Sequence, residues 1–157
     1  MIKNIKTNTK EETLELGKKL SNFLFKGSVV LLCGHLGAGK TTLTKGIGKG
    51  LGVEEEINSP TFNILKCYFN KTLNLYHIDA YRLEDVPEEN KNIGLEEVID
   101  GDGCAIIEWP QFISEFIDYK KALIITITID ENNVRNFKFE TENLKFEGLF
   151  AGLLWLV

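Results

Sequence analysis

The most constraining feature of the sequence is a glycine-rich loop between an apolar run and a helical pattern. The loop, residues 34–42, reads Gly-His-Leu-Gly-Ala-Gly-Lys-Thr-Thr and completes the pattern G-x-x-x-x-G-K-[ST]. Backbone N–H groups in such a loop, together with the positive end of the following helix dipole, point at one small volume that suits phosphate groups. The sequence therefore predicts a site for a nucleoside triphosphate.

The residue types of the loop agree with that chemistry. Glycines at 34, 37 and 39 allow backbone angles that a β-carbon would penalise, and they let the chain approach phosphate oxygens closely. Lys40 is placed to reach the β and γ phosphates, and the Thr41 hydroxyl is placed to ligate Mg²⁺.

The flanking segments favour a strand, loop and helix in an α/β domain rather than an ordinary glycine turn. Residues 28–33 form a continuous apolar run, which is typical of a strand that is buried on both faces. Residues 41–51 carry Leu43, Ile47 and Leu51 at helical spacing.

Composition limits the function classes. A chain of 157 residues is long enough to bury one full core, so we expect a single domain over residues 1–157. The net charge of −5 argues against a protein that grips nucleic acid through a basic face. Cys33, Cys67 and Cys104 follow no metal or disulfide spacing, and residues 1–12 contain no apolar stretch of the signal-peptide kind. We therefore expect reduced core cysteines and a cytoplasmic location.

Hydrophobic periodicity and turn residues outline the rest of the chain. Thr9 and Glu12 have the spacing of a capping box, and Gly17 is either a small contact residue or a local weakness of the helix that follows. The further predicted elements are an edge strand at 2–7, a helix at 10–25, strands at 62–69 and 73–80, a strand at 104–107, a helix at 111–117 and a hairpin of 122–129 with 134–141. The charged segment 84–103 is either a solvated surface segment or holds short helical turns such as 95–99.

The end of the chain, from about residue 144 to 157, is apolar. Its segment 146–157 has twelve residues, fewer than the ~20 that a membrane-spanning helix needs. We expect a helix or strand that docks on the body of the protein, with a membrane or partner contact as the alternative.

A nucleotide's Mg²⁺ needs a carboxylate at the end of a neighbouring strand, and two candidates exist. Asp79 follows a segment in which Leu73, Leu75 and His77 alternate, as in a half-buried strand. Glu108 closes a run that is apolar throughout, as expected beside the phosphate strand. We therefore assign Glu108 to the metal and Asp79 to a water or the outer shell, although either carboxylate could also be a capping residue.

Two further residues near these carboxylates stay ambiguous. His77 is more typical of a structural histidine than of a catalytic one, because phosphoryl transfer depends on positioning and charge. Trp109 either packs on the nucleotide or fills the core.

Four motifs taken in order resemble the TsaE (YjeE) family of small bacterial ATPases, which are required for threonylcarbamoyladenosine formation on tRNA. They are Gly37-Ala38-Gly39-Lys40-Thr41-Thr42, Ser59-Pro60-Thr61-Phe62, His77-Ile78-Asp79-Ala80-Tyr81-Arg82-Leu83 and Glu108-Trp109-Pro110. The resemblance covers roughly residues 5–140. It implies a single P-loop α/β domain with a mixed, partly parallel sheet and helices on both sides.

The resemblance also implies ATP with Mg²⁺ as the cofactors. Thr41 and Glu108 would ligate the metal, Thr61 would lie in a loop that senses the γ-phosphate, and Asp79 would be a second functional carboxylate. Residues that would contact the nucleotide are Leu36, Gly37, Ala38, Gly39, Lys40, Thr41, Thr42 and Trp109. The family docks on the TsaB and TsaD proteins and resets that complex by hydrolysis, so tRNA is an indirect partner and no membrane is involved. His35, at a position where an acidic residue is common, and the long apolar tail depart from the family pattern.

A P-loop kinase for small molecules or nucleotides is the main alternative. Such kinases clamp phosphates with arginines, and this chain has only Arg82 and Arg135. A GTPase is disfavoured because Asn70-Lys71-Thr72-Leu73 lacks the aspartate of N-K-x-D. A third class is a nucleotide-gated interaction module. Unless Arg82 turns inward, no arginine finger is evident in the chain, so we expect slow hydrolysis that partners stimulate.

Overall fold

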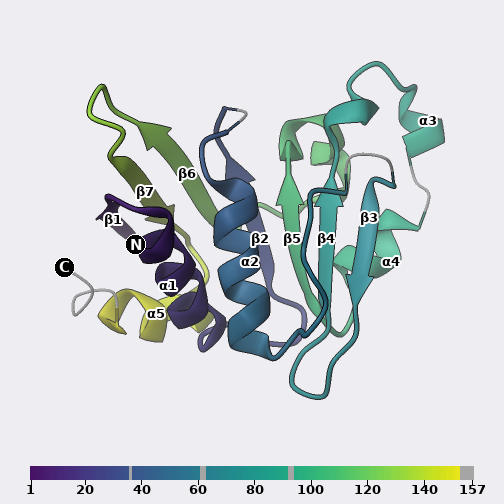
Figure 1. Ribbon diagram of the computed structural model, residues 1–157. Coiled ribbons are helices and arrows are strands. Elements are labelled where there is room, and N and C mark those ends of the chain that lie inside the picture. Colours follow the sequence, from purple (N-terminus) through teal and green to yellow (C-terminus); the bar gives the residue numbers. More distant parts are fainter. Residues whose placement is uncertain (36, 61–62, 92–93, 153–157) are drawn as a thin grey trace.

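A computed structural model describes residues 1–35, 37–60, 63–91 and 94–152. In this part of the chain, the strands form one seven-stranded sheet in the order β1-β7-β6-β2-β5-β4-β3 (Figure 1). The strands are β1 (Ile2–Thr7), β2 (Val29–Cys33), β3 (Leu65–Tyr68), β4 (Leu75–Asp79), β5 (Cys104–Glu108), β6 (Leu123–Ile129) and β7 (Arg135–Glu140). Neighbours among β6, β2, β5 and β4 pair in parallel, whereas β1, β7 and β3 pair antiparallel with their neighbours. The predicted mixed sheet is confirmed.

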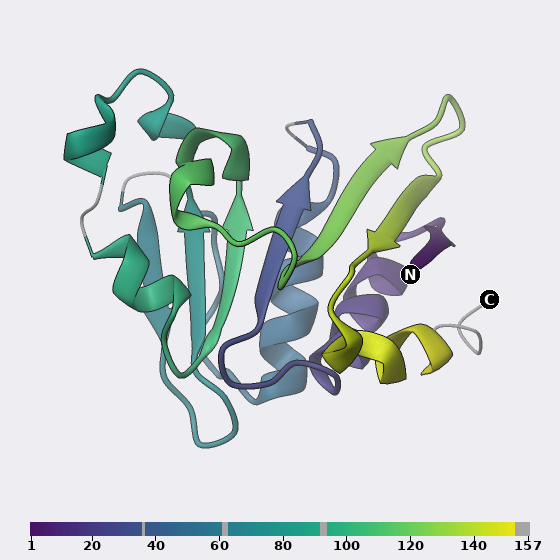
Figure 2. The ribbon, with the colours of Figure 1, turned by 180° about the vertical axis from the view of Figure 1, so that it is seen from behind.

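Helices cover both faces of the sheet, as predicted (Figures 1 and 2). One face carries α1 (Lys10–Ser21), α2 (Lys40–Leu51) and α5 (Glu147–Gly152). The other face carries α4 (Leu95–Ile99) and the 3₁₀ turns η1 (Tyr81–Leu83) and η2 (Pro110–Phe116). A short helix, α3 (Glu88–Lys91), precedes α4, and a third 3₁₀ turn, η3 (Leu144–Phe146), precedes α5.

Strand β2, which precedes the glycine loop, is buried on both faces because its side chains alternate between two apolar cores. Val30 and Leu32 join the core beneath α1 and α2, whereas Val29 and Leu31 join the core beneath α4 and η2. Strand β5 lies directly beside β2, as its apolar sequence predicted.

Helices α1 and α2 pack with their backbones unusually close. A β-carbon on Gly17 would lie 2.4 Å from the Leu43 carbonyl oxygen, and one on Gly46 would lie 2.3 Å from the Leu14 carbonyl oxygen. Gly17 is therefore a contact residue, which resolves the question that its sequence position left open.

The N-terminus of α1 is capped as the sequence predicted. The Thr9 side chain accepts a hydrogen bond of 3.1 Å from the Glu12 backbone N–H. The Glu12 carboxylate in return accepts one of 2.7 Å from the Asn8 N–H.

Three predictions about elements were wrong. Strand β4 is not half-buried, because His77 and its neighbours Leu75, Tyr76 and Ile78 are all buried between β5 and β3. Helix α1 ends at Ser21 rather than at residue 25. The segment 111–117 forms the 3₁₀ turn η2, with non-helical angles at Ile113, rather than an α-helix.

The described part of the apolar tail docks on the protein. Phe146 and Leu149 are buried in the core beneath α1, and Phe150 packs against it. Residues 153–157 lie outside the described residues. Within the described ranges, no helix has the length and apolar character needed to cross a membrane. Cys33, Cys67 and Cys104 are free, but only Cys104 is buried.

Candidate nucleotide-binding site

The parallel strands end at the top of Figure 1, and the predicted site residues that the structure describes close these strands or directly follow them. Strand β2 leads into the glycine loop, and α2 begins at Lys40. Glu108, the last residue of β5, pairs with Leu32 of β2 on one side and with Asp79 of β4 on the other. The edge thus combines the glycine loop with both candidate carboxylates. This is the place where open α/β sheets bind ligands.

The backbone of the loop takes the angles that its glycines permit. Gly37 has φ 79° and Gly39 has φ 113°, both in the region that disfavours a β-carbon. A β-carbon on Gly37 would meet no atom of the described residues within 4 Å. Thr41 and Thr42 follow, half-buried, in the first turn of α2.

Lys40 links the loop to the end of β5. Its ammonium donates a hydrogen bond of 2.9 Å to the Gly34 carbonyl oxygen and lies 3.9 Å from Oε1 of Glu108. It also lies 4.5 Å from the centre of the Trp109 ring. Because only 5% of Lys40 is exposed, its charge lies in a low-dielectric environment, where electrostatic interactions are stronger than in water.

Glu108 has a second buried partner, a histidine for which the sequence favoured a structural role over a catalytic one. His77 Nε2 lies 2.6 Å from Oε2 of Glu108. His77 is fully buried, and Glu108 is 4% exposed. Of the two Glu108 carboxylate oxygens, Oε2 therefore contacts His77, and Oε1 faces Lys40.

Asp79 ends β4 beside Glu108 but has different partners. Its Oδ1 accepts a hydrogen bond of 3.1 Å from the Tyr81 N–H, and its Oδ2 accepts one of 3.3 Å from the Ser59 hydroxyl. Asp79 thus binds the first residue of η1 and contacts the segment just before residue 61. Leu36 and Thr61, both predicted site residues, lie outside the described residues.

Trp109 has backbone angles in the left-handed region, φ 58° and ψ 49°. Its ring stacks on Phe112 at 5.9 Å and lies 5.0 Å from the Tyr81 ring. The sequence left two roles open for Trp109, and the half-buried ring takes part in core packing while also contacting Lys40.

Arg135, at the start of β7, is a residue that the sequence analysis missed as part of the site. Its Nε donates a hydrogen bond of 3.0 Å to the Ala38 carbonyl oxygen, and a β-carbon on Gly39 would lie 3.1 Å from the same nitrogen. The sequence analysis considered only Arg82 as an arginine that could turn toward the site, and the structure places Arg135 beside the loop. No local pattern marks Arg135, because it comes from a distant strand.

The donor set suits Mg²⁺ shared with phosphate oxygens. Among the described residues, no group of three or more His, Cys, Asp or Glu side chains could hold a metal. Mg²⁺ at phosphate sites takes one or two protein carboxylates and completes its shell with phosphates and waters. Glu108 and the Thr41 hydroxyl match that requirement.

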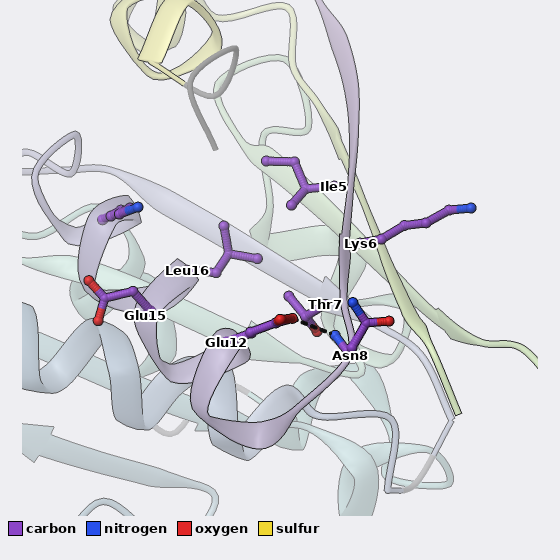
Figure 3. Close-up of a pocket in the computed structure, with 8 residues that line it drawn as sticks. Ile5, Lys6, Thr7, Asn8, Glu12, Glu15 and Leu16 are labelled. Atoms are coloured by element: carbon purple, nitrogen blue, oxygen red, sulfur yellow. Dashed lines mark hydrogen bonds between the residues drawn. The ribbon is translucent and has the colours of Figure 1, made fainter. Parts of the chain in front are cut away.

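A separate hollow of about 360 Å³ lies between β1 and α1 (Figure 3). Ile5 and Thr7 of β1 and Glu12 and Leu16 of α1 line it together with polar side chains. Part of its rim is the bond from Asn8 to Glu12 that caps α1. Of the predicted nucleotide residues that the structure describes, none lines this hollow.

Comparisons with known proteins agree on one family. The family model described as threonylcarbamoyl adenosine biosynthesis protein TsaE matches residues 7–137. The TsaE protein of Bacillus subtilis is 42% identical over 120 residues, which are 76% of this chain and 74% of that protein. The TsaE protein of Rickettsia prowazekii is 36% identical over 143 residues, which are 90% and 97% of the two chains.

A solved structure gives the same answer for the fold. The crystal structure of Bacillus subtilis YdiB superimposes with a TM-score of 0.80 at 34% identity and covers 98% of this chain and 95% of that one. The glycine loop on a mixed, partly parallel sheet is the P-loop NTPase arrangement predicted from the sequence. The chain therefore belongs to the TsaE family, whose proteins serve in the biosynthesis of threonylcarbamoyladenosine on tRNA.

Proposed function

We propose that the chain binds ATP with Mg²⁺ at the carboxyl edge of its sheet and hydrolyses it in the cytoplasm, in support of tRNA threonylcarbamoyladenosine formation. The observation that carries this proposal is the convergence of two elements. Lys40 comes from the glycine loop and Glu108 from β5, and their charged atoms are 3.9 Å apart. A cation and a carboxylate at the mouth of such a loop are what a Mg²⁺-triphosphate requires.

The chain's own residues would divide the work. Amides of the loop and of the first turn of α2 would cradle the phosphates, and Lys40 would turn from the Gly34 carbonyl toward the β and γ phosphates. Thr41 and Glu108 would hold Mg²⁺, which supplies positive charge that neutralises the charge developing on the phosphate oxygens. Asp79 would orient a water, and Thr61 would sense the γ-phosphate.

We expect slow hydrolysis by the isolated chain. Arg135 is held by the Ala38 carbonyl, close to the start of the loop helix, and this position suits binding of the nucleotide. Partners that add positive charge at the γ-phosphate would accelerate the reaction. The TsaB and TsaD proteins are the proposed partners, and tRNA is met through them.

A reconstituted transfer assay tests the proposal. Purified TsaB, TsaD, tRNA and the threonylcarbamoyl donor are combined with ATP. The number of modified tRNA molecules formed per TsaB-TsaD complex is then measured. Multiple turnovers should require this chain and should disappear with Lys40→Ala or Glu108→Ala. Lys49→Ala, which removes an exposed charge from the last turn of α2, serves as the matched control and should retain activity.

Two results would contradict the proposal. If the number of turnovers is the same without this chain, its place in the modification is wrong. If radioactive γ-phosphate moves to a nucleoside or another small acceptor rather than to water, the chain is a P-loop kinase.

A further inference from the structure

His77 and Glu108 form a buried pair across two strands. His77 lies on β4 and Glu108 on β5, and both side chains lie on the α2 side of the sheet, where Leu75 and Ile106 join the core. The separation of 2.6 Å between His77 Nε2 and Glu108 Oε2 marks a short hydrogen bond with a charged partner. Burial removes competing water from this bond.

The direction of this hydrogen bond depends on the tautomer of His77, and we assign the donor role to Nε2. An ionised carboxylate can only accept hydrogen bonds, so His77 donates from Nε2. The other ring nitrogen, Nδ1, is buried and has no hydrogen-bond partner among the described residues. Among the described residues, the hydrogen bond of this ring is thus made to a candidate site residue.

The bond also controls the other end of Glu108. With Oε2 held by His77, Oε1 stays 3.9 Å from the Lys40 ammonium, too far for a hydrogen bond. Without the imidazole N–H, the buried carboxylate would lack this donor for Oε2, and Lys40 is a cation beside it among the described residues. A close pair of Lys40 and Glu108 would compete with phosphate for Lys40 and with Mg²⁺ for Glu108.

We infer that His77 is a positioning residue, which holds Glu108 by one oxygen so that the other oxygen is available to Mg²⁺ and Lys40 is available to phosphate. This inference rests on the proposed nucleotide site and adds a residue to it. Partners that orient metal ligands typically change metal affinity 10- to 100-fold when they are removed.

Amide substitutions separate this role from simple packing. In His77→Gln the amide nitrogen can take the place of Nε2, whereas in His77→Asn it takes the place of Nδ1 and cannot reach Glu108. Tyr68→Phe is the matched control, because the Tyr68 hydroxyl is also buried on this side of the sheet and has no partner among the described residues. Affinity for ADP is measured with and without Mg²⁺, and thermal unfolding is recorded for each variant.

The expected result is that His77→Asn weakens the effect of Mg²⁺ on ADP binding, whereas the other variants do not. His77→Asn should raise the Mg²⁺ concentration for half-maximal enhancement of ADP binding by about 10- to 100-fold. His77→Gln and Tyr68→Phe should stay within about 3-fold of the unaltered chain. The inference is wrong, although the proposed function stands, if His77→Asn leaves the Mg²⁺ concentration for half-maximal enhancement unchanged. It is also wrong if His77→Gln and His77→Asn change that concentration equally. If the unaltered chain shows no Mg²⁺-dependent ADP binding, the proposed function itself fails.

A measurement on the unaltered chain does not depend on folding of the variants. Nitrogen-15 NMR of the ring nitrogens distinguishes the two tautomers, and the sequence contains only one other histidine, His35. The inference predicts a proton on Nε2 of His77 and a resonance that shifts when Mg²⁺ is added to the ADP complex. A neutral ring with its proton on Nδ1, or a resonance indifferent to Mg²⁺, would overturn it.

Discussion

At the scale of single residues, Arg135 illustrates how a distant strand brings a side chain to the glycine loop of the candidate site. Its bond to the Ala38 carbonyl joins residues 97 positions apart. Because Nε makes this bond, the terminal nitrogens of the guanidinium remain as donors, and such a planar fork matches phosphate oxygens. We therefore expect Arg135 to contribute to nucleotide binding.

Replacement of Arg135 tests this expectation. Arg135→Ala should weaken ADP binding by about 10-fold, which corresponds to the loss of one charge-assisted hydrogen bond. Arg135→Lys should recover little of that affinity, because a lysine lacks the planar guanidinium fork. Lys138→Ala removes a charge from the exposed face of the same strand and is the control. Isothermal titration gives the affinities. Equal affinities for Arg135→Ala and Lys138→Ala would exclude a role for Arg135.

The sequence predicted the site residues that lie within a local pattern, and it missed those that depend on strand order. The glycine loop and Lys40 follow from one contiguous motif, and Glu108 follows from an apolar run that ends in a carboxylate. His77 and Arg135 contact these residues only because β4 lies beside β5 and because β7 brings its first residue to the loop. No spacing along the chain encodes such contacts.

At the scale of elements, the contact between α1 and α2 fixes how the loop helix sits on the sheet. Gly17 and Gly46 let the two helix backbones meet, and a β-carbon at either position would be within 2.4 Å of a carbonyl oxygen. Helix propensity alone would favour alanine over glycine at Gly17 by about 1 kcal/mol. The packing outweighs that preference, because rigid backbone atoms cannot move aside.

Substitution of Gly17 distinguishes propensity from packing. Gly17→Ala should lower the free energy of unfolding by about 2 kcal/mol, in the range of overpacked cores, and should weaken nucleotide binding by displacing α2. Gly148→Ala on α5 is the control, because its β-carbon would lie 3.8 Å from the nearest atom, an ordinary contact. Denaturant unfolding measures both. A Gly17→Ala chain more stable than the unaltered one would refute the close contact.

The mispredicted elements share a physical cause. Strand β4 has the alternating sequence of a half-buried strand, but its flanking strands and the layers on both faces bury it completely. The segment after Glu108 has helical composition, yet Trp109 and Pro110 lead it into the 3₁₀ turn η2. Tertiary packing overrides local preference at both places.

At the scale of the whole molecule, the sheet separates two apolar cores, and the reactivity of the buried Cys104 thiol measures how well the folded protein excludes solvent. Its thiol is buried at the start of β5, and burial raises the pKa of Cys104 to about 12. The thiolate is the reactive form, so the folded protein should protect this residue at every pH below that value. The folded state favours the neutral thiol more strongly than the unfolded state does. The contribution of the Cys104 thiol to the free energy of unfolding is therefore fully present below pH 9.0 and is lost as the pH rises toward about 12.

Thiol labelling measures this protection. At pH 8 the native chain should react with iodoacetamide only at Cys33 and Cys67, and slowly, because burial raises the pKa of both thiols as well. Cys104 should react after unfolding in guanidinium chloride, as mass spectrometry of peptides will reveal. Labelling of Cys104 at the rate of the other two would mean that the sheet opens easily.

The central claim is that the carboxyl edge of this sheet binds a Mg²⁺-nucleotide through Lys40 and Glu108. Calorimetric titration of the purified chain with ADP and ATP, with and without Mg²⁺, tests it most directly. We predict one site per chain, tighter binding with Mg²⁺, loss of binding in Lys40→Ala and loss of the Mg²⁺ effect in Glu108→Ala. Absence of binding by the unaltered chain, or unchanged binding in Lys40→Ala, would contradict the claim.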